Sequence, residues 1–438
     1  MFHVTINREQ LFYPKGGVNM KLAFKYTTRW TDKQLEIMEE LSYHLSKLYN
    51  IVNYDCRENG YRKYTVLEKE YKVNWHTPFL HSHTYQQALK VLDQNWKSYF
   101  ASAKDYKKHP SKYKGEPRQP GFKNDKRKAT IIFTNYAVRV RGNQLLLSLS
   151  KKMQEIFNVK SLNLPFPSGV AEHVDESSIQ QVRLVWKQEQ KDWEIIIIHK
   201  REEKRFEADN TNIMSIDIGL DNLCAITFKD NSNQYLISGR TVKSKNSYFN
   251  KEIARLTSAQ MLETGNKRFK RTNRISRLQA KRNRVMKDAM HKASRKVIEL
   301  AIENKCKAIV LGDLKDIKQE SAIKSFVQVP VMKLIDQIRY KAELEGIKVV
   351  QTKETYTSGV SAYDMEAVTK ANYNKKRRVK RGLFKTEKGY EVNSDINGSL
   401  NILRKYMVEE ELTNVVPIQV KELRDNGCMD HPVRLQVV

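Results

Sequence analysis

The chain has 438 residues, of which 79 are Lys or Arg and 50 are Asp or Glu, so its formal net charge is +29 at pH 7. This excess is larger than solubility requires and predicts a polyanionic partner. Hydrophobic residues make up 40% of the chain and aromatic residues 9%, which is enough for packed cores and excludes a basic disordered tail. At roughly 150 residues per domain, the length allows about two or three domains.

No segment has the pattern of a secretory signal or of a membrane span. The N-terminal segment has no apolar core, and no run approaches the roughly 18 apolar residues that a membrane span needs. The cysteines Cys56, Cys224, Cys306 and Cys428 stand far apart and form no CxxC pair. We therefore expect reduced thiols, no membrane partner and a cytoplasmic, nucleoid-associated location of the prokaryotic type.

The N-terminal part combines a strand with two helices. Residues 1–19 are expected to form a loose extension, followed by a strand at 21–27. Thr31 and Gln34 have the spacing of a capping box, and the apolar residues that follow recur every three or four positions, which predicts an amphipathic helix. A second helix is predicted over about 84–106, and its aromatic stripe is typical of core packing.

Residues 107–128 are rich in Lys, Arg, Pro and Gly, which ends the helical module. Short strands are expected after it, at 129–133, 137–140, 144–149, 182–187 and 193–199. Short strands separated by turns are typical of antiparallel barrels and sandwiches. We therefore predict a small β-barrel that includes the first strand and carries the helical module as an insertion.

The pattern changes to alternating strands and helices after about residue 206, which predicts an α/β sheet domain. The expected elements are two strands within 213–228, a long helical region at 247–303, a strand at 308–311, a helix at 331–345, a strand at 347–352 and a helix at 396–406.

Two aspartates have surroundings that suggest chemistry. Asp217 stands between Ile216 and Ile218 in an apolar strand, where a carboxylate is costly unless it is paired with a cation. Its alternative role is to cap the turn before Gly219, and helix capping alone would explain Asp395. Together, however, the two match a two-metal site, in which carboxylates from different elements surround ions that are about 3.5–4 Å apart. Oxygen ligands favour Mg²⁺ or Mn²⁺ over zinc.

Four segments between about residues 213 and 406 resemble, in order, the RuvC nuclease domain of TnpB proteins. These transposon-encoded, RNA-guided DNA endonucleases are related to Fanzor and to type V CRISPR effectors. The segments are IMSIDIGLDNLCAIT, KAIVLGDLKDIKQ, the run from SFVQVPVMKL to KETYTS, and KRGLFKTEKGYEVNSDINGSLNILRKY. PGFK at 120–123 and the helix around Trp96 are more loosely similar. The resemblance implies a RuvC/RNase H-like α/β nuclease domain and an N-terminal β-barrel (wedge) domain with an inserted helical recognition module.

The implied domains are an N-terminal extension and first wedge strand at 1–30, the helical recognition module at 31–109, the wedge barrel at 110–205, the first part of the nuclease at 206–354, a basic insertion at 355–392, the last nuclease motif and helix at 393–412, and a C-terminal tail at 413–438.

The chain departs from the common motif at the second acidic position. Where most relatives have a glutamate at the end of a strand, this chain has Gly312 followed by Asp313. Adjacent strand residues face opposite ways, so Asp313 would point away from the site unless the strand bulges. One branch of the family carries the glutamate on the next strand, and Glu354 matches that position. The resemblance therefore implies Asp217, Glu354 and Asp395 as catalytic residues and ligands of two Mg²⁺ or Mn²⁺ ions, with Asp313 a weaker alternative.

A second departure is the missing zinc ribbon. Common TnpB proteins have two CxxC pairs before the last aspartate, whereas residues 357–393 contain no cysteine. We therefore expect no zinc. The insertion is instead expected to bind nucleic acid through its basic residues Lys375, Lys376, Arg377, Arg378, Lys380 and Arg381.

A second basic run, at 267–284, holds nine basic residues and no acid. They are Lys267, Arg268, Lys270, Arg271, Arg274, Arg277, Lys281, Arg282 and Arg284. A solvated helix face is the alternative, but these charges would repel each other without a polyanion alongside. Phosphate contacts carry no sequence information. In the resembled family, a guide RNA reads double-stranded target DNA by base pairing.

The resemblance implies an RNA-guided DNA endonuclease that also recognises a short target-adjacent motif through the barrel and the helical module. Candidate contacts to that motif are Arg118, Lys123, Tyr85 and Gln86, although packing within the module would explain Tyr85 equally well.

Four alternatives stay open. A nuclease-inactive, RNA-guided repressor would explain Gly312 as decay of the site, but the joint presence of Asp217 and Asp395 argues against it. A CRISPR-associated type V effector derived from TnpB would carry much the same motifs. A transposase needs strand-transfer machinery, for which we find no motif. A guide-free junction resolvase would not need the barrel, the helical module and the large positive charge.

Overall fold

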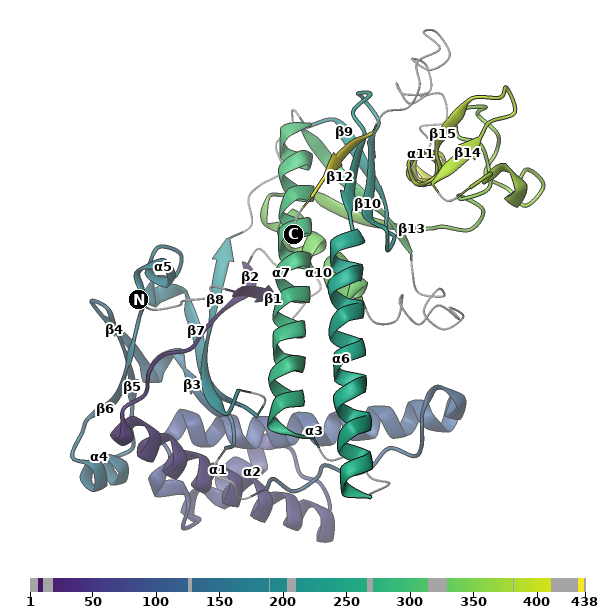
Figure 1. Ribbon diagram of the computed structural model, residues 1–438. Helices are drawn as coiled ribbons and strands as arrows, with labels where there is room; N and C mark the ends of the chain where they lie inside the picture. The colour runs from purple at the N-terminus through teal and green to yellow at the C-terminus, as the bar shows by residue number, and fades with distance from the viewer. Residues whose placement is uncertain are drawn as a thin grey trace. The chain divides into compact units, whose positions relative to one another are not determined.

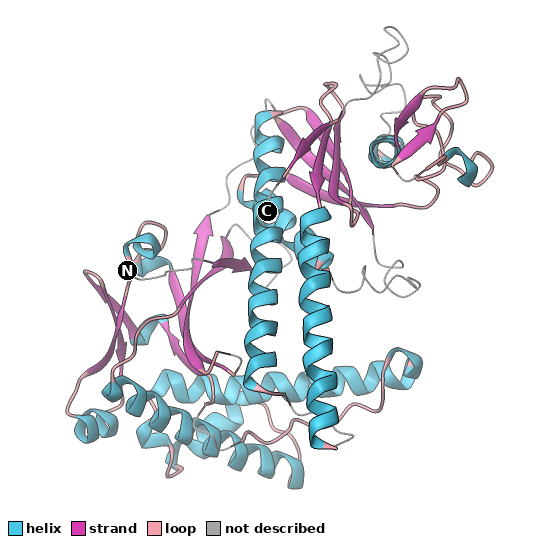
Figure 2. Ribbon diagram, in the orientation of Figure 1, coloured by secondary structure: helices cyan, strands magenta, loops and turns pink. Residues whose placement is uncertain are grey.

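The computed structural model divides into two compact units, Met1–Arg201 and Glu202–Val438, which we describe separately (Figures 1 and 2). The residues that it describes are 7–10, 19–124, 128–188, 190–202, 210–265, 271–313, 329–380, 382–410 and 432–436. No helix within these ranges is both long enough and apolar enough to cross a bilayer.

Three helices of the N-terminal unit lie between its strands β2 (Asn19–Tyr26) and β3 (Ile131–Thr134) in the sequence. They are α1 (Asp32–Glu58), α2 (Tyr64–Glu70) and α3 (Ser82–Lys108). The predicted capping box starts α1, because the Thr31 side chain accepts from Gln34 N and the Gln34 side chain accepts from Thr31 N. The helical module is therefore an insertion between two strands, as predicted.

The strands of this unit form two antiparallel sheets. The larger has the order β1-β2-β8-β7-β3, and the smaller has the order β4-β5-β6. The strands not yet given are β1 (Asn7–Gln10), β4 (Val138–Arg141), β5 (Gln144–Ser148), β6 (Ser161–Pro165), β7 (Ile179–Lys187) and β8 (Asp192–Glu202), and short helices α4 (Lys151–Phe157) and α5 (Ser168–Ala171) lie between them. One hydrophobic core joins both sheets to the inner faces of α1 and α3.

One expectation about the N-terminus is wrong. Residues 1–19 were expected to be a loose extension, but β1 adds an edge strand to the larger sheet, with Asn7 opposite Lys25. Its sequence, NREQ, is polar throughout. Hydrophobic periodicity therefore could not reveal it, because an edge strand can be held by backbone hydrogen bonds alone.

The C-terminal unit is built on a six-stranded sheet in the order β13-β12-β9-β10-β11-β16. Strands β9 (Asn212–Asp217), β10 (Asn222–Phe228) and β11 (Tyr235–Ser238) are antiparallel neighbours, whereas β12 (Cys306–Asp313) and β13 (Lys348–Lys353) continue the sheet in parallel to β9. The short strand β16 (Val433–Leu435) pairs with β11.

Helices cover both faces of this sheet. Apolar side chains of α7 (Asn273–Glu303) and α10 (Val331–Leu344) share a core with one face. Helix α11 (Ser394–Glu409) packs on the opposite face through Ile402, Leu403 and Tyr406. The predicted α/β sheet domain is thus confirmed.

The helical region predicted over 247–303 is two helices, not one. Helix α6 (Arg240–Thr264) ends at Gly265, whose positive φ of 54° is a left-handed conformation that glycine adopts without strain. Thr272 then caps α7 by accepting a hydrogen bond from Ile275 N. The helical periodicity continues on both sides of this break, which is why the sequence suggested one long helical region.

Candidate active site

Asp217 is the last residue of β9, on the sheet face that α11 covers. Met214 and Ile216 point into the core with α7, so the alternating residues Ser215 and Asp217 face α11. Helix α11 approaches closely because it has a glycine there: a Cβ on Gly398 would lie 2.5 Å from Asp217 Oδ2. The last helix therefore brings its own residues directly over the first aspartate.

A cluster of three buried hydroxyls fixes α11 on the sheet, and the sequence analysis did not identify it. Oγ of Ser215 lies 2.7 Å from Oγ1 of Thr227 and 3.0 Å from Oγ of Ser399. The Ser215 hydroxyl also donates to the backbone oxygen of Ser399, and the Ser399 hydroxyl donates to that of Ser215. These bonds join the strand of Asp217 to the helix of Asp395.

Asp395 lies in the first turn of α11 but is not its cap. Asn393 performs that role by accepting hydrogen bonds from Asp395 N and Ile396 N. The Asp395 carboxylate accepts instead from Asn222 Nδ2 at 2.7 Å and lies 3.4 Å from Arg378 Nη2. Capping therefore does not account for Asp395, and Asn222 is a partner that the sequence analysis missed.

Glu354 occupies the space that a side chain at position 312 would fill. Gly312 of β12 lies opposite Thr352 of β13, so Glu354, two residues further along, faces the same side of the sheet. A Cβ on Gly312 would lie 1.7 Å from Glu354 Oε1. Gly312 is also one residue beyond Leu311, which lies opposite Ile216 in β9, so this position is next to Asp217.

Asp313 is the next residue along β12 and faces away from Gly312, as strand alternation predicts. Its charge still contributes to raising the pKa of Glu354. Glu354, and not Asp313, therefore lies on the face that carries Asp217.

The acidic side chains of this face are electrostatically strained. Burial, followed by the negative charge of Asp395, raises the pKa of the Asp217 carboxyl, and the positive charge of Arg378 partly opposes the shift. Burial also raises the pKa of Glu354, with contributions from Asp217 and Asp313. Such clusters of repelling carboxylates are stabilised by a cation.

The described residues contain no group of three His, Cys, Asp or Glu side chains gathered closely enough to hold a metal ion. The donor chemistry nevertheless fits a divalent cation that prefers oxygen. Glu354 Oε1 is buried and has no hydrogen-bond partner among the described residues. A buried carboxylate oxygen without a hydrogen-bond partner, next to a second carboxylate, has the chemistry of a ligand for such a cation.

Two family models match parts of this chain. A family described as a probable transposase (OrfB_IS605) matches residues 196–318, and one described as Cas12f1-like, TNB domain, matches residues 332–402. The TnpB-like protein ORF457 of Acidianus two-tailed virus is 26% identical over 411 residues, which cover 85% of this chain and 83% of that protein. The chain is thus similar both to TnpB-like proteins and to type V effectors.

Two further relatives extend the comparison. The CRISPR-associated endodeoxyribonuclease Cas12f1 of Sulfoacidibacillus thermotolerans is 22% identical over 363 residues, or 78% of this chain and 80% of that protein. A cryo-EM structure of a Cas12f1–sgRNA–target DNA complex has a TM-score of 0.60 at 16% identity, and the match covers 87% of this chain and 83% of that one. This likeness confirms the predicted RuvC-like α/β fold.

Two buried asparagines of α11 hold the base of the insertion. Asn397 Nδ2 donates to Val360 O at 2.8 Å, and Asn397 Oδ1 accepts from Ala362 N at 2.9 Å. One turn later, Asn401 Nδ2 donates to the backbone oxygens of Thr357 and Val360. The helix that carries Asp395 therefore also holds the base of the insertion.

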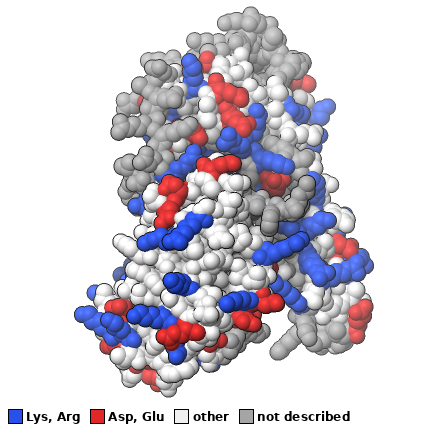
Figure 3. All heavy atoms as spheres, turned by 90° about the vertical axis from the view of Figure 1, so that its left-hand side faces the viewer, with Lys and Arg blue, Asp and Glu red and all other residues white. Residues whose placement is uncertain are grey.

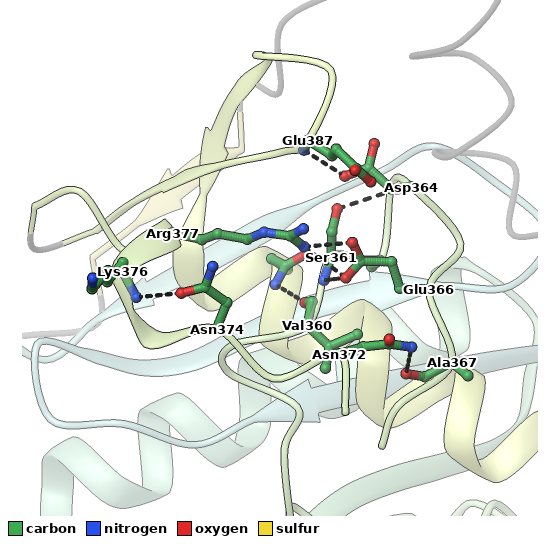
Figure 4. A network of polar contacts seen from close by, with 12 residues as sticks. Val360, Ser361, Asp364, Glu366, Ala367, Asn372, Asn374, Lys376, Arg377 and Glu387 are labelled. Atoms are coloured by element: carbon green, nitrogen blue, oxygen red, sulfur yellow. Dashed lines mark hydrogen bonds and ion pairs between the residues drawn. The ribbon is translucent and has the colours of Figure 1, made fainter. Parts of the chain in front are cut away.

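Within the insertion, a network of polar contacts is built around an ion pair between Arg377 and Glu366 (Figure 4). The Arg377 guanidinium lies 2.6 and 2.7 Å from the two carboxylate oxygens of Glu366, which also accepts from Ser361 N. Nearby, Asp364 accepts from the backbone nitrogen of Glu387, which leads into the hairpin of β14 (Leu383–Lys385) and β15 (Glu391–Asn393). Ordinary polar contacts thus organise this segment.

This network involves one of the expected nucleic-acid contacts. The Arg377 side chain is only 20% exposed and pairs with Glu366, so it has a structural partner within the insertion, and its contact with nucleic acid stays a prediction. Lys375, Lys376 and Lys380 are exposed, whereas Arg378 contacts Asp395. Arg381 lies outside the described residues.

The described part of the basic run at 267–284 lies mostly in the first half of α7. Lys267, Arg268 and Lys270 lie outside the described residues. Exposed side chains of this run are Arg271, Arg274, Arg277, Lys281 and Arg284. Arg282 is partly buried and donates to Asn246 Oδ1 of α6 at 2.9 Å, so it joins the two helices. On the face drawn in Figure 3, basic and acidic side chains are mixed and do not form one patch.

The four expected contacts to a target-adjacent motif differ in exposure. Arg118 is exposed. The Lys123 ammonium lies 4.6 Å from the ring centre of Tyr49 on α1, and burial lowers its pKa. Tyr85 is buried and its hydroxyl donates to a backbone oxygen of α2, which supports the packing alternative. Gln86 is partly buried and lies 3.5 Å from the Glu68 carboxylate of the same helix.

Proposed function

We propose that this protein is an RNA-guided DNA endonuclease whose site comprises Asp217, Glu354 and Asp395, as in the relocated-glutamate branch of its family. The observation that carries the proposal is the Glu354 carboxylate over Gly312. If Gly312 marked decay of the site, nothing would require a buried, unpaired acid to lie beside Asp217. Relocation explains both residues at once.

The three carboxylates would hold two Mg²⁺ or Mn²⁺ ions, with no need for zinc. When bound, such ions activate a water for in-line attack and stabilise the leaving 3′ oxygen. The chain's own residues prepare the site: Gly398 lets α11 approach Asp217, and Asn222 orients the Asp395 carboxylate. The guanidinium of Arg378 partly neutralises that carboxylate, and a bound metal ion would take over this role.

The charge of the chain and its similarity to known proteins support RNA and DNA as partners. A relative is named an endodeoxyribonuclease, and a Cas12f1 of the same fold has been solved with a guide RNA and target DNA. A net charge of +29 suits a protein that holds an RNA and a guide–target heteroduplex. Base pairing would select the target, and the N-terminal unit would read a short flanking motif.

The proposal is tested with protein co-expressed with the DNA that flanks its gene. Bound RNA is sequenced, and a plasmid that matches its guide segment is incubated with Mg²⁺ and either wild type or Asp217→Asn. We expect a discrete RNA in both preparations, cleavage by the wild type and none by the variant. Discrete RNA without wild-type cleavage would favour a guided repressor, and absence of a discrete RNA would contradict the proposal.

A further inference from the structure

The short strand β16 puts a basic side chain on the sheet face that carries the proposed site. One row of residues crosses four neighbouring strands, and each member is paired with the next: Asp217, Ala225, Leu236 and Arg434. Ala225 and Leu236 pack with Ile396 and Leu400 of α11, so this row faces that helix. Arg434 therefore lies on the same face as Asp217, at the opposite end of the row.

Two contacts of β16 itself fix the direction of this side chain. The backbone nitrogen of Val433 donates to Gln234 O at 2.9 Å, and Leu435 packs against the core on the sheet face that α7 covers. Adjacent strand residues point to opposite faces, so the packing of Leu435 directs Arg434 toward α11. The position of Arg434 thus follows from the strand and does not depend on its own polar contacts.

Arg434 reaches the site through the amide of Asn222. Its Nη1 donates to Asn222 Oδ1 at 3.3 Å, and Asn222 Nδ2 donates to Asp395 Oδ2 at 2.7 Å. A guanidinium has only donors and a carboxylate has only acceptors, so a single orientation of the amide satisfies both neighbours. Asn222 is buried, which keeps water from replacing either contact freely. The three side chains therefore form one directed chain of hydrogen bonds.

The charges at the two ends of this chain strengthen its central bond. No carboxylate of the described residues pairs with Arg434, and its hydrogen bond goes to the neutral amide. A cation on one side of an amide and an anion on the other polarise it, which favours donation to Asp395. The other carboxylate oxygen of Asp395 lies near Arg378, a charge that a bound cation would repel. The neutral amide of Asn222 is free of that repulsion and can keep its bond.

We propose that Arg434 is a positioning residue, which acts through Asn222 to fix the Asp395 carboxylate as a ligand for a divalent cation. The segment 413–438, expected from the sequence to be a tail, then contributes a side chain to the nuclease site. This inference rests on the proposed function and deepens it, because it adds strand β16 to the elements that prepare the site.

Binding of Mn²⁺ tests the positioning role without relying on cleavage. Mn²⁺ is titrated into the purified full chain, free ion is measured by electron paramagnetic resonance, and Asp217→Asn gives the binding that does not involve the site. Arg434→Ala should weaken the remaining binding by about threefold or more, and Asn222→Ala by about tenfold. Arg434→Lys, which keeps a charged donor, should retain most of the affinity, and Val433→Ala, at an exposed neighbour, all of it. Unchanged binding in Arg434→Ala would overturn the inference.

A double variant tests whether Arg434 acts through Asn222. The measured quantity is the Mg²⁺ concentration that gives half-maximal cleavage of a matching plasmid. Arg434→Ala combined with Asn222→Ala should need no more Mg²⁺ than Asn222→Ala alone, because the arginine has no route to Asp395 without the amide. If the effects of the two single variants multiply instead, Arg434 acts independently, for example on a phosphate of the nucleic acid, and the inference is wrong.

Two further readouts separate this inference from a structural role and from the proposed function. Without metal, Arg434→Ala should melt within about 2 °C of wild type, as other surface substitutions do. A larger fall would mean that Arg434 only holds β16 in place, which would overturn the inference. If the wild type cleaves no target but Arg434→Ala still weakens Mn²⁺ binding, the proposed function fails and the positioning of Asp395 stands. If the wild type binds no more Mn²⁺ than Asp217→Asn, the positioning role is wrong, and cleavage alone then decides the proposed function.

Discussion

The proposed site depends on a pair of residues, a glycine at position 312 and a glutamate at position 354. Gly312 leaves the space that the Glu354 carboxylate fills, with 1.7 Å between its ideal Cβ position and Oε1. Real atoms cannot approach this closely, so any side chain at 312 must displace the carboxylate. The two positions are therefore coupled, and substitutions at them should not be additive.

We predict that Gly312→Ala lowers the rate of target cleavage by about tenfold or more, because it moves a metal ligand without removing it. The double variant Gly312→Glu with Glu354→Ala should cleave faster than Glu354→Ala alone, since it puts a carboxylate back on the same face. Rates are measured with guide-loaded protein in excess over target. Normal cleavage by Gly312→Ala would contradict the coupling.

The buried acids also predict a dependence of stability on pH. Because the pKa values of Asp217 and Glu354 are raised in the folded protein, the folded state keeps protons that the unfolded chain releases. The contribution of these two groups to the stability of the metal-free protein is therefore largest below their ordinary pKa values, 3.8 for Asp and 4.5 for Glu, and it falls as pH rises through the raised values.

Thermal unfolding of the metal-free protein checks this prediction. Glu354→Gln should be more stable than wild type at pH 8, and the difference should shrink toward pH 5. Added Mg²⁺ should raise the melting temperature of wild type more than that of the variant. A difference that does not change with pH would contradict the assignment of a strained acid.

At the scale of elements, α11 connects the insertion to the site. It carries Asp395, approaches Asp217 at Gly398 and anchors residues 357–362 through Asn397 and Asn401. The Glu366–Arg377 pair then holds the rest of the segment together, so that Arg378 reaches Asp395.

We predict that Arg377→Ala loosens the insertion, because it leaves the Glu366 carboxylate, 14% exposed, without its partner. The cost is up to about 3 kcal/mol, since the pair is only partly buried. Limited proteolysis should cut within residues 355–392 much faster than in wild type, whereas Lys376→Ala, at an exposed neighbour, should resemble wild type. A chelator should not reproduce the effect, since no cysteine lies in 357–393.

The sequence predicted elements better than it predicted contacts. Apolar periodicity located α1, α3, α10 and the strands β9, β10, β12 and β13 of the C-terminal sheet, because burial forces these patterns. It missed the polar edge strand β1, the strands β11 and β16, and the break at Gly265. Alternation predicts that Asp313 faces away from Gly312, whereas the hydroxyl cluster and the Glu366–Arg377 pair join residues too far apart in the chain for any local pattern to reveal.

At the scale of the whole molecule, the excess positive charge is divided among separate basic segments. The arginines of α7 differ in their surroundings. Arg277 and Arg284 are exposed, whereas Arg282 is partly buried and joins α7 to α6. Only the exposed ones can contact phosphate. Nonspecific affinity should therefore depend on a subset of the run.

We predict that Arg277→Ala with Arg284→Ala weakens RNA binding and reduces its salt dependence, because each lost phosphate contact lowers the slope of log K against log salt by about 1. Arg255→Ala removes an exposed arginine of α6 that pairs with Glu252 and should change the slope little. Filter binding at several salt concentrations measures the slopes. Equal slopes for the double variant and wild type would contradict the phosphate contacts.

The most direct test of the account compares two acids that are close in space but differ in the face they occupy. Guide-loaded Glu354→Ala and Asp313→Ala are incubated with a matching plasmid and Mg²⁺, after sequencing has shown that both hold the same RNA as wild type. We expect Glu354→Ala to lose more than about 100-fold in cleavage rate and Asp313→Ala to stay within about tenfold of wild type. Loss of cleavage in Asp313→Ala, with activity kept in Glu354→Ala, would contradict the relocated site.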